Sequence, residues 1–282
     1  MFRATPSNYL AGKVVWVTGA SSGLGEELAV SAAEAGARGV ILSGRRDDAL
    51  AAVRERCIAA SPSKSEACVR VLGFDLSDLG ELPSKARQAL GEYGALDVLV
   101  LNAGVSTRSS VDRTSLDVDK TVMNVNYFSA ITLAKAVLGH MLERRCGHLV
   151  VVNSVQGKFG MPFRSSYSAS KHALQGFFDS LRAEVAGHGV KVTSIFPGYI
   201  RTRLSENALI GDGQKYSQTD ATTAAGKHPR DVAGQVWTSV ASGREDVVLA
   251  DAKVKVAILL RTLMPATLFK IMAKRARTTA NQ

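Results

Sequence analysis

Cysteine is scarce in this chain of 282 residues, which contains only Cys57, Cys68 and Cys146. These three form no CxxC pair and are odd in number, so their spacing argues against a disulfide framework and against a zinc site. The five histidines likewise lack a ligand spacing such as HExxH. We therefore predict an intracellular protein of a reducing compartment, without a metal site.

Long uncharged hydrophobic runs are also missing from the sequence. No segment offers the roughly 20 apolar residues that a membrane-spanning helix needs. The first residues, MFRATPSNYLAGK, have no apolar stretch long enough for a secretory signal. The sequence therefore predicts neither a membrane span nor a signal peptide.

Acidic residues are absent after Asp251, although 46% hydrophobic and 21% charged residues are ordinary values for a globular protein. The Lys and Arg residues of this last part supply seven of the ten net positive charges, so the rest of the chain is nearly balanced. We expect one large domain over residues 1–251 and a basic extension over residues 252–282.

The extension alternates cations with apolar clusters and is interrupted by Pro265. Such a pattern over residues 252–277 suits a pair of helices that lies in a membrane interface with anionic lipid. A helical arm that packs on the domain or on a second copy, with its lysines in solvent, fits the same pattern. Binding of nucleic acid through the extension would require a steep salt dependence, and we expect no nucleic-acid partner.

Hydrophobic runs alternate with helical patterns along the large domain. Candidate strands lie at 14–18, 39–44, 68–75, 97–104, 148–154, 190–198 and 246–250, and candidate helices at 24–35, 47–60, 78–92, 118–144, 165–187 and 229–241. Strands that are apolar on both faces and separated by helices predict an α/β fold, a doubly wound Rossmann-type sheet of seven parallel strands with helices on both faces. Ligands of such folds bind beyond the carboxyl ends of the strands.

A glycine-bearing turn, TGASSGLG, joins the first strand to the first helix. Glycines allow a tight turn in which a cofactor phosphate can lie against backbone amides at the positive end of the helix. A glycine-rich connection without a ligand is the alternative, but the position between strand and helix favours binding. The residues that we predict to bind cofactor here are Gly19, Ser21, Ser22, Gly23, Leu24 and Gly25.

The end of the second strand bears on the choice of cofactor. Enzymes that prefer NAD usually carry a carboxylate here, whereas this chain has Ser43 and Gly44 followed by Arg45 and Arg46. Guanidinium groups suit a phosphate, so we predict NADP(H) in preference to NAD(H). The alternative is that both arginines begin a solvated helix and pair with the next two aspartates.

Two further strand ends carry candidate cofactor ligands. Asp75, followed by Leu76, could accept a hydrogen bond from an adenine amino group or could cap the next helix. Asn102, Ala103 and Gly104 end the fourth strand, and small residues there would let a cofactor approach the backbone closely.

The stretch YSASK places Tyr167 and Lys171 four residues apart. In a helix the two side chains project from the same face, so their polar ends can meet. A solvent-facing pair of neighbours is the simpler reading of this stretch by itself.

Six motifs together resemble the short-chain dehydrogenase/reductase family over roughly residues 12–250. They are TGASSGLG, NAG, Asn126 in NVNYF, Ser154 in VVNSVQG, YSASK and FPGYIRT, and they occur in the order of that family. Leu101 before NAG and Asn153 before Ser154 depart from its commoner residues. Within the family the chain is similar to the membrane-associated lipid, steroid and retinoid reductases, and most of all to the dehydrogenase/reductase member seven-B group.

The resemblance implies a catalytic set of four residues. Tyr167 would be the acid and base, with a pKa that the neighbouring Lys171 ammonium lowers from its usual value near 10. Lys171 would also hold the nicotinamide ribose, Ser154 would orient the substrate oxygen, and Asn126 would distort its helix and seat a water that connects the lysine to solvent. The loop after the sixth strand would contact the cofactor through Pro197, Gly198, Ile200 and Thr202.

The implied function is transfer of a hydride between NADP(H) and a carbonyl or secondary alcohol of a hydrophobic substrate, such as a lipid or a steroid. Reduction of acyl-dihydroxyacetone phosphate is a more specific alternative, and a sensor or scaffold that binds nucleotide without turnover is a rival of another class. Residues 199–227 are irregular and predict a lid or a binding loop. The family resemblance also implies a homo-oligomer, located in the cytoplasm or attached peripherally to an organelle membrane such as that of the endoplasmic reticulum or peroxisome.

Overall fold

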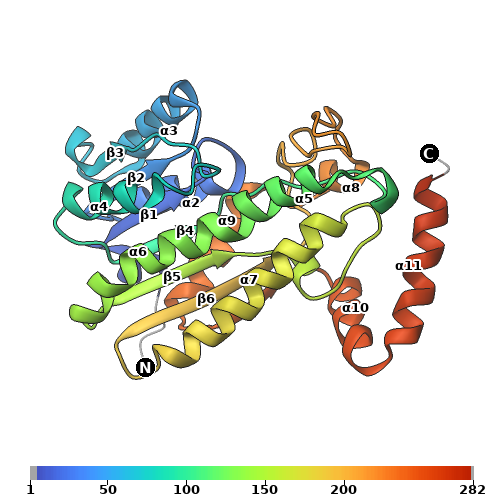
Figure 1. Ribbon diagram of the computed structural model, residues 1–282. Helices are drawn as coiled ribbons and strands as arrows, with labels where there is room; N and C mark the ends of the chain where they lie inside the picture. Colours follow the sequence, from blue (N-terminus) through green and yellow to red (C-terminus); the bar gives the residue numbers. More distant parts are fainter. Residues whose placement is uncertain (1–4, 281–282) are drawn as a thin grey trace.

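The computed structural model describes residues 5–280. Residues 1–4 of the predicted domain and residues 281–282 of the predicted extension lie outside the described part of the chain. Its centre is a parallel sheet covered by helices on both faces (Figure 1). The strand order is β3-β2-β1-β4-β5-β6-β7. The strands are β1 (Val14–Thr18), β2 (Gly39–Ser43), β3 (Val69–Val71), β4 (Val98–Leu101), β5 (Gly147–Val152), β6 (Val190–Pro197) and β7 (Asp246–Leu249). The predicted doubly wound sheet of seven strands is confirmed.

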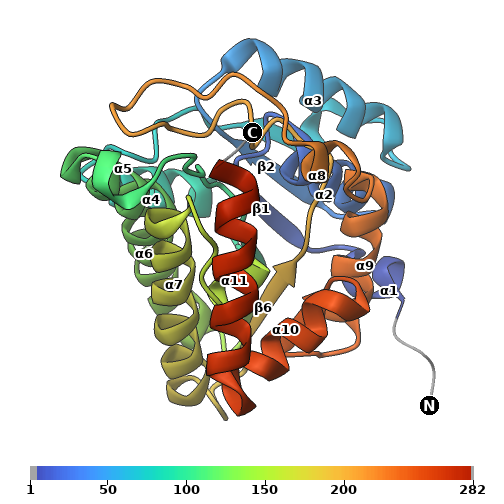
Figure 2. The same cartoon turned by 90° about the vertical axis from the view of Figure 1, so that its right-hand side faces the viewer.

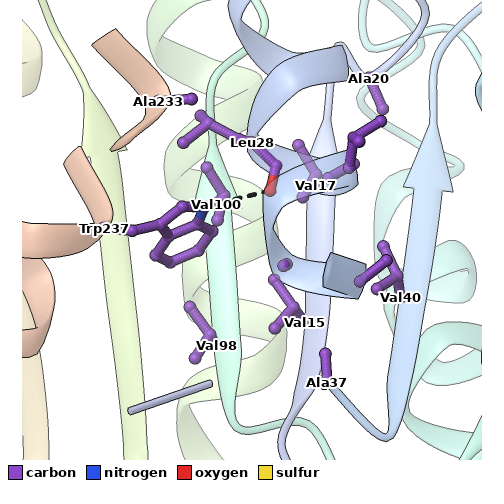
Figure 3. Close-up of a cluster of buried hydrophobic side chains, with 14 of the residues drawn as sticks. Val15, Val17, Ala20, Leu28, Ala37, Val40, Val98, Val100, Ala233 and Trp237 are labelled. Atoms are coloured by element: carbon purple, nitrogen blue, oxygen red, sulfur yellow. Dashed lines mark hydrogen bonds between the residues drawn. The ribbon is translucent and has the colours of Figure 1, made fainter. Parts of the chain in front are cut away.

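One face of the sheet packs against α2 (Gly23–Glu34), α3 (Asp47–Ala60) and α9 (Pro229–Ala241). Trp237 of α9 is 1% exposed and donates its indole N–H to the carbonyl oxygen of Leu28 in α2 at 3.1 Å (Figure 3). Burial of such a ring is favourable because its one polar atom has a partner.

The other face packs against α4 (Leu82–Glu92), α6 (Ser129–Glu143) and α7 (Ser165–Glu184). Their apolar residues, among them Leu133 and Phe178, are fully buried against the sheet. Because both faces are covered, the strands are apolar throughout, which is the pattern that the sequence shows.

Several predicted boundaries differ from the structure, and three elements differ most. β3 ends at Val71 and not at residue 75, although the N–H groups of Leu72 and Phe74 still donate to carbonyl oxygens of the neighbouring β2 segment. The helix predicted from residue 78 begins at Leu82, because a turn precedes it. The long helix predicted over 118–144 consists of α5 (Leu116–Met123), a π-helical turn (Asn124–Phe128) and α6.

Within residues 5–280, four further α-helices lie outside these layers. They are α1 (Pro6–Leu10), α8 (Ala221–Ala224), α10 (Ala252–Leu263) and α11 (Pro265–Ala280). The last two form the basic extension and turn at Pro265, so the predicted helix pair is present (Figure 2). Leu268 of α11 is 2% exposed and packs with Phe159, Met161 and Phe196 of the large domain. No helix between residues 5 and 280 is long and apolar enough to cross a membrane.

Candidate active site

The glycine turn brings backbone amides to the carboxyl end of β1. Gly19 and Gly23 have φ angles of 65° and 64°, which residues with a Cβ rarely adopt. A Cβ at Gly25 would collide with the carbonyl oxygen of Gly19 and with the Asn102 amide nitrogen 2.5 Å away. The predicted glycines are therefore required by the turn itself.

The same turn can accept an anion. Ser22 occupies the N-cap of α2 but makes no side-chain capping bond, so the first amides of this helix have no partner from the cap. Leu24 is buried beside them, while Ser21 accepts a hydrogen bond from Arg46. Free amides at a helix N-terminus fit a dinucleotide phosphate.

Asn102 and Ala103 hold the end of β4 against the end of β1. The Asn102 side chain donates to the carbonyl oxygens of Thr18 (3.0 Å) and Gly19 (3.3 Å), and the Ala103 N–H donates to the Thr18 hydroxyl at 3.3 Å. Both predicted residues thus shape the cofactor turn from the neighbouring strand.

The two arginines after β2 have different surroundings. Arg46 donates to the carbonyl oxygen of Ser21 at 3.1 Å and so supports the glycine turn. Arg45 is 72% exposed at its side chain and faces Asp75 at 3.8 Å. Asp75, four residues beyond the end of β3, also accepts from the N–H of Ser77 at 2.9 Å. This contact belongs to a turn: the next helix, α4, has Glu81 at its N-cap, so the alternative that Asp75 caps that helix is wrong. Leu76 is buried in the core on one side of the sheet.

Asn126 lies within the π-helical turn between α5 and α6. Its Oδ1 accepts the Val105 N–H at 2.8 Å, and its Nδ2 donates to the Val105 carbonyl oxygen and to the Ser170 hydroxyl, both at 2.9 Å. The local distortion of the helix that the resemblance implies at Asn126 is therefore present. Through these bonds the Asn126 side chain joins the loop after β4 to the helix that carries Tyr167.

Ser154, Tyr167 and Lys171 meet at the carboxyl end of β5. Ser154 follows this strand and shares a side-chain hydrogen bond with Tyr167 of α7. The Lys171 ammonium nitrogen lies 5.7 Å from the centre of the Tyr167 ring and donates to the Val152 carbonyl oxygen at 3.1 Å. A Cβ added at Gly104 would lie 3.7 Å from the same nitrogen, so the end of β4 borders the site.

Burial governs the protonation of both groups in this structure. It raises the pKa of Tyr167, while the hydrogen bond with Ser154 and the positive charges of Arg108 and Arg164 lower it. Burial also lowers the pKa of Lys171 to about 8. The main contributions that favour the phenolate thus come from Ser154 and two arginines, and the sequence interpretation had named only the lysine.

The segment after β6 completes the border of the site. The Gly198 N–H donates to the Leu249 carbonyl oxygen at 3.2 Å just after Pro197, and Ile200 is bridged to Lys227. A Cβ at Gly23 would lie 3.0 Å from the Thr202 methyl group, so this segment reaches the glycine turn.

Arg108, Arg164 and Asp220 are residues of the site that the sequence interpretation missed. Both arginines donate to the same Asp220 oxygen, and both lower the pKa of Tyr167. Arg164 stands three residues before Tyr167, where an arginine among small and apolar residues is a weak signal. Asp220 lies 112 residues from Arg108 in the chain, and no sequence pattern joins them.

All three cysteines are free, as their spacing predicts. Among residues 5–280 no cluster of three or more His, Cys, Asp and Glu side chains could hold a metal ion.

Known proteins share this architecture and sequence. The pattern that describes the short chain dehydrogenase family matches residues 13–211. The dehydrogenase/reductase SDR family member 7B of Bos taurus is 47% identical over 270 residues, which cover 95% of this chain and 83% of the bovine protein. Membership of the predicted family, and likeness to the predicted group within it, are confirmed.

Two solved structures show the same fold. A short-chain dehydrogenase of Burkholderia cenocepacia, crystallised with NADP, has a TM-score of 0.75 at 24% identity over 93% of this chain and 98% of its own. A short-chain dehydrogenase/reductase of Burkholderia phymatum, crystallised with NAD, has a TM-score of 0.78 at 24% identity over 93% of this chain and 94% of its own.

Proposed function

The chain belongs to the short-chain dehydrogenase/reductase family and is an oxidoreductase, and we propose that it transfers a hydride between NADP(H) and a carbonyl or secondary alcohol of a hydrophobic substrate. The observation that carries this proposal is the convergence of Ser154, Tyr167 and Lys171 at the carboxyl end of β5, with Asn126 behind them. A protein that only sensed nucleotide would have no chemical need for this set.

Each side chain has a separate task in the proposed reaction. When bound, the cofactor supplies or accepts the hydride at its nicotinamide ring. Ser154 holds the substrate oxygen, and Tyr167 gives a proton to that oxygen in reduction or removes it in oxidation. Lys171 binds the nicotinamide ribose, while Ser154 and the charges of Arg108 and Arg164 favour the phenolate. The amides of the glycine turn hold the diphosphate.

The preference for NADP(H) is supported by the residues after β2. The three residues directly after Ser43 are Gly44, Arg45 and Arg46, so no carboxylate at the end of β2 would repel a 2′-phosphate, and the exposed Arg45 guanidinium would bind it. Asp75 and Leu76 would border the adenine, and Pro197, Gly198, Ile200 and Thr202 would border the nicotinamide half.

A hydrophobic substrate is supported by the surroundings of α7. A cavity of about 500 Å³ lies between this helix and α11, lined by Met161, Pro162, Leu268, Phe269 and Met272 among others. Ser165, Ser168, His172 and Arg261 also line this cavity, and Ser154 and Tyr167 do not. The cavity therefore supports an apolar ligand next to α7 and does not mark where the reacting carbon would lie.

The basic extension is proposed as a peripheral membrane contact. Leu259, Leu263 and Phe269 are 59%, 74% and 56% exposed. These side chains share α10 and α11 with seven cations and no acid, so they can enter a lipid interface while the cations attract anionic headgroups. We accordingly propose residues 1–251 as the catalytic domain and 252–282 as the membrane-contacting part. The proposed location is the cytoplasm or the surface of the endoplasmic reticulum or peroxisome. The proposed assembly is a homo-oligomer.

A substrate panel tests the proposed reaction. Purified protein is assayed with NADPH and NADH against aliphatic and steroid ketones and acyl-dihydroxyacetone phosphate, and with NADP⁺ and NAD⁺ against the corresponding alcohols. Tyr167→Phe should lower kcat at least about 100-fold, whereas Tyr93→Phe, which loses only a hydroxyl bonded to the Ala67 carbonyl oxygen, should not. Full turnover by Tyr167→Phe would exclude the assigned proton transfer.

Vesicle flotation tests the membrane contact. Binding should be stronger to vesicles with anionic lipid than to neutral vesicles, and the double variant Leu259→Ser and Leu263→Ser should bind weakly while all cations remain. If the double variant binds as well as the natural chain, and duplex DNA competes for both, the extension binds polyanions and not a lipid surface.

A further inference from the structure

Three segments from different parts of the chain are tied together at one carboxylate. Arg108 lies in the loop after β4, Arg164 immediately precedes α7, and Asp220 lies in the irregular segment between β6 and α9. Together with Ser205 they form a set that we call the Asp220 cluster. Its side chains are 10%, 10% and 16% exposed for Arg108, Arg164 and Asp220, so the charges are largely withdrawn from water.

The cluster holds two cations on one anion. Arg108 donates to Asp220 Oδ2 through Nε at 2.9 Å and through Nη2 at 2.5 Å, and Arg164 Nη2 donates to the same oxygen at 2.9 Å. The Ser205 hydroxyl donates to it at 3.2 Å. The two arginines lower the pKa of Asp220, so it is ionised and the cluster has a net charge of +1.

The guanidinium of Arg108 is fixed from the other side as well. Its Nη1 donates to the Ser106 hydroxyl and the Thr107 carbonyl oxygen, both at 2.8 Å. Its own backbone N–H donates to the Leu209 carbonyl oxygen at 2.8 Å. The position of the Arg108 guanidinium is therefore fixed both by the loop after β4 and by the irregular segment.

The charged groups around Tyr167 come from its own helix and from two loops. Lys171 lies one turn further along α7, and Arg108 and Arg164 come from the loops. Asp119 of α5 is bound to Ser166. Burial raises the pKa of Tyr167, and the two arginines oppose that rise. Asp220 is the anion that both arginines share.

We propose that Asp220 is a positioning residue for Tyr167, because it binds Arg108 and Arg164, the second of which is the N-cap of the helix that carries Tyr167, and so sets how much of their positive charge acts on the phenol. The inference rests on the proposed role of Tyr167 as acid and base. It adds that the irregular segment, through Asp220, adjusts the strength of that acid. A purely structural tie between loops would have no such effect on proton transfer.

Opposite charge changes in the cluster should move the proton transfer in opposite directions. The test is the pH dependence of kcat and kcat/KM for alcohol oxidation, in which Tyr167 must lose its proton. Arg164→Met removes a cation and should raise the apparent pKa of the acidic limb of the pH–rate profile by about one unit. Asp220→Asn leaves two cations without their shared anion and should lower that apparent pKa by a similar amount. Arg164→Lys keeps the charge and should restore the natural profile.

A spectroscopic titration separates this inference from the proposed reaction. Cofactor-free protein is labelled with ¹³C at the ζ-carbon of its tyrosines. The NMR signal that is missing from the spectrum of Tyr167→Phe belongs to Tyr167 and reports the protonation of its phenol without any substrate. It should titrate at higher pH in Arg164→Met and at lower pH in Asp220→Asn. Thermal unfolding checks that each variant folds, and Ser205→Ala, which removes one donor from Asp220, replaces any variant that does not.

The outcomes are distinct. Opposite shifts support the proposal even if no substrate in the panel is turned over, because the NMR titration needs none. Two results would show that the Asp220 cluster only ties the loops together. In the first, Arg164→Met and Asp220→Asn shift the pKa of Tyr167 in the same direction. In the second, activity falls while the acidic limb of the pH profile and the titration of the Tyr167 signal do not change.

Discussion

Asn126 and Val105 are bonded in both directions: the Asn126 side chain accepts the Val105 N–H at 2.8 Å and donates to its carbonyl oxygen at 2.9 Å. A side-chain amide can do both at neutral pH, whereas an ionised carboxylate of the same size has no donor. The pair fixes the loop after β4 against the π-helical turn.

Asn126→Asp should therefore impair both stability and turnover. A buried carboxylate would face the Val105 carbonyl oxygen and the Ser170 hydroxyl, with its donors lost, at a cost of roughly 2 kcal/mol or more in the free energy of unfolding. Urea unfolding and kcat are measured beside Asn207→Asp, an exposed position. Equal effects in the two variants would contradict the assigned role of the pair.

Gly25→Ala should prevent formation of the cofactor turn. The added methyl group would overlap the Gly19 carbonyl oxygen and the Asn102 amide, and relief of such an overlap costs about 1–3 kcal/mol. The expected result is weaker binding of NADPH in a fluorescence titration together with a lower Tm. Gly91→Ala is the matched control, because its methyl group would meet no atom within 4 Å in α4, where alanine is the better helix former.

Arg45→Ala should change the choice between cofactors. Loss of one charge-assisted contact to a 2′-phosphate should raise the KM for NADPH about tenfold and leave the KM for NADH unchanged. Arg87→Ala, on the exposed side of α4, serves as the control for a lost surface charge. A protein that uses NADH better than NADPH before any substitution would contradict the proposed preference.

His148 should make the fold sensitive to acid. This side chain is buried between the Tyr9 hydroxyl and the Thr193 hydroxyl, and burial lowers its pKa from 6.5 to about 3, with Lys191 and Lys13 contributing. Because the folded pKa lies below the unfolded one, its contribution to stability is complete above pH 6.5. The contribution decreases as the pH falls toward 3, by up to about 1.4 kcal/mol per unit.

Urea unfolding between pH 7 and pH 5 measures this dependence. The loss of stability should be smaller in His148→Asn than in the natural chain, while His188→Asn, at an exposed position, should keep the natural slope. Parallel slopes in all three proteins would rule out His148 as the source.

The sheet and most helices could be predicted from the sequence because their signals are local. Each apolar run marks a strand that is buried on both faces, and helix α3 begins and ends where its pattern does. The π-helical turn at Asn126 could not be read from periodicity, since it depends on bonds to Val105 and Ser170. Only the family resemblance pointed to it.

The candidate site divides in the same way. Tyr167 and Lys171 lie one turn apart on α7, so their meeting follows from helix geometry. The Asp220 cluster joins loops from three parts of the chain, and its partners became visible only when the fold had placed them together. The β3 boundary was wrong because the chain beyond Val71 stays beside β2 without continuing the strand.

The position of β1 between β2 and β4 inside the sheet has a consequence for synthesis on the ribosome. This strand pairs with β2 soon after both emerge, but its other edge pairs with β4, which begins at Val98. Until β4 leaves the exit tunnel, an apolar strand of the nascent chain presents unpaired N–H and C=O groups, which favour aggregation. Translation that stalls between residues 75 and 97 should therefore yield a product that depends on chaperones to stay dissolved.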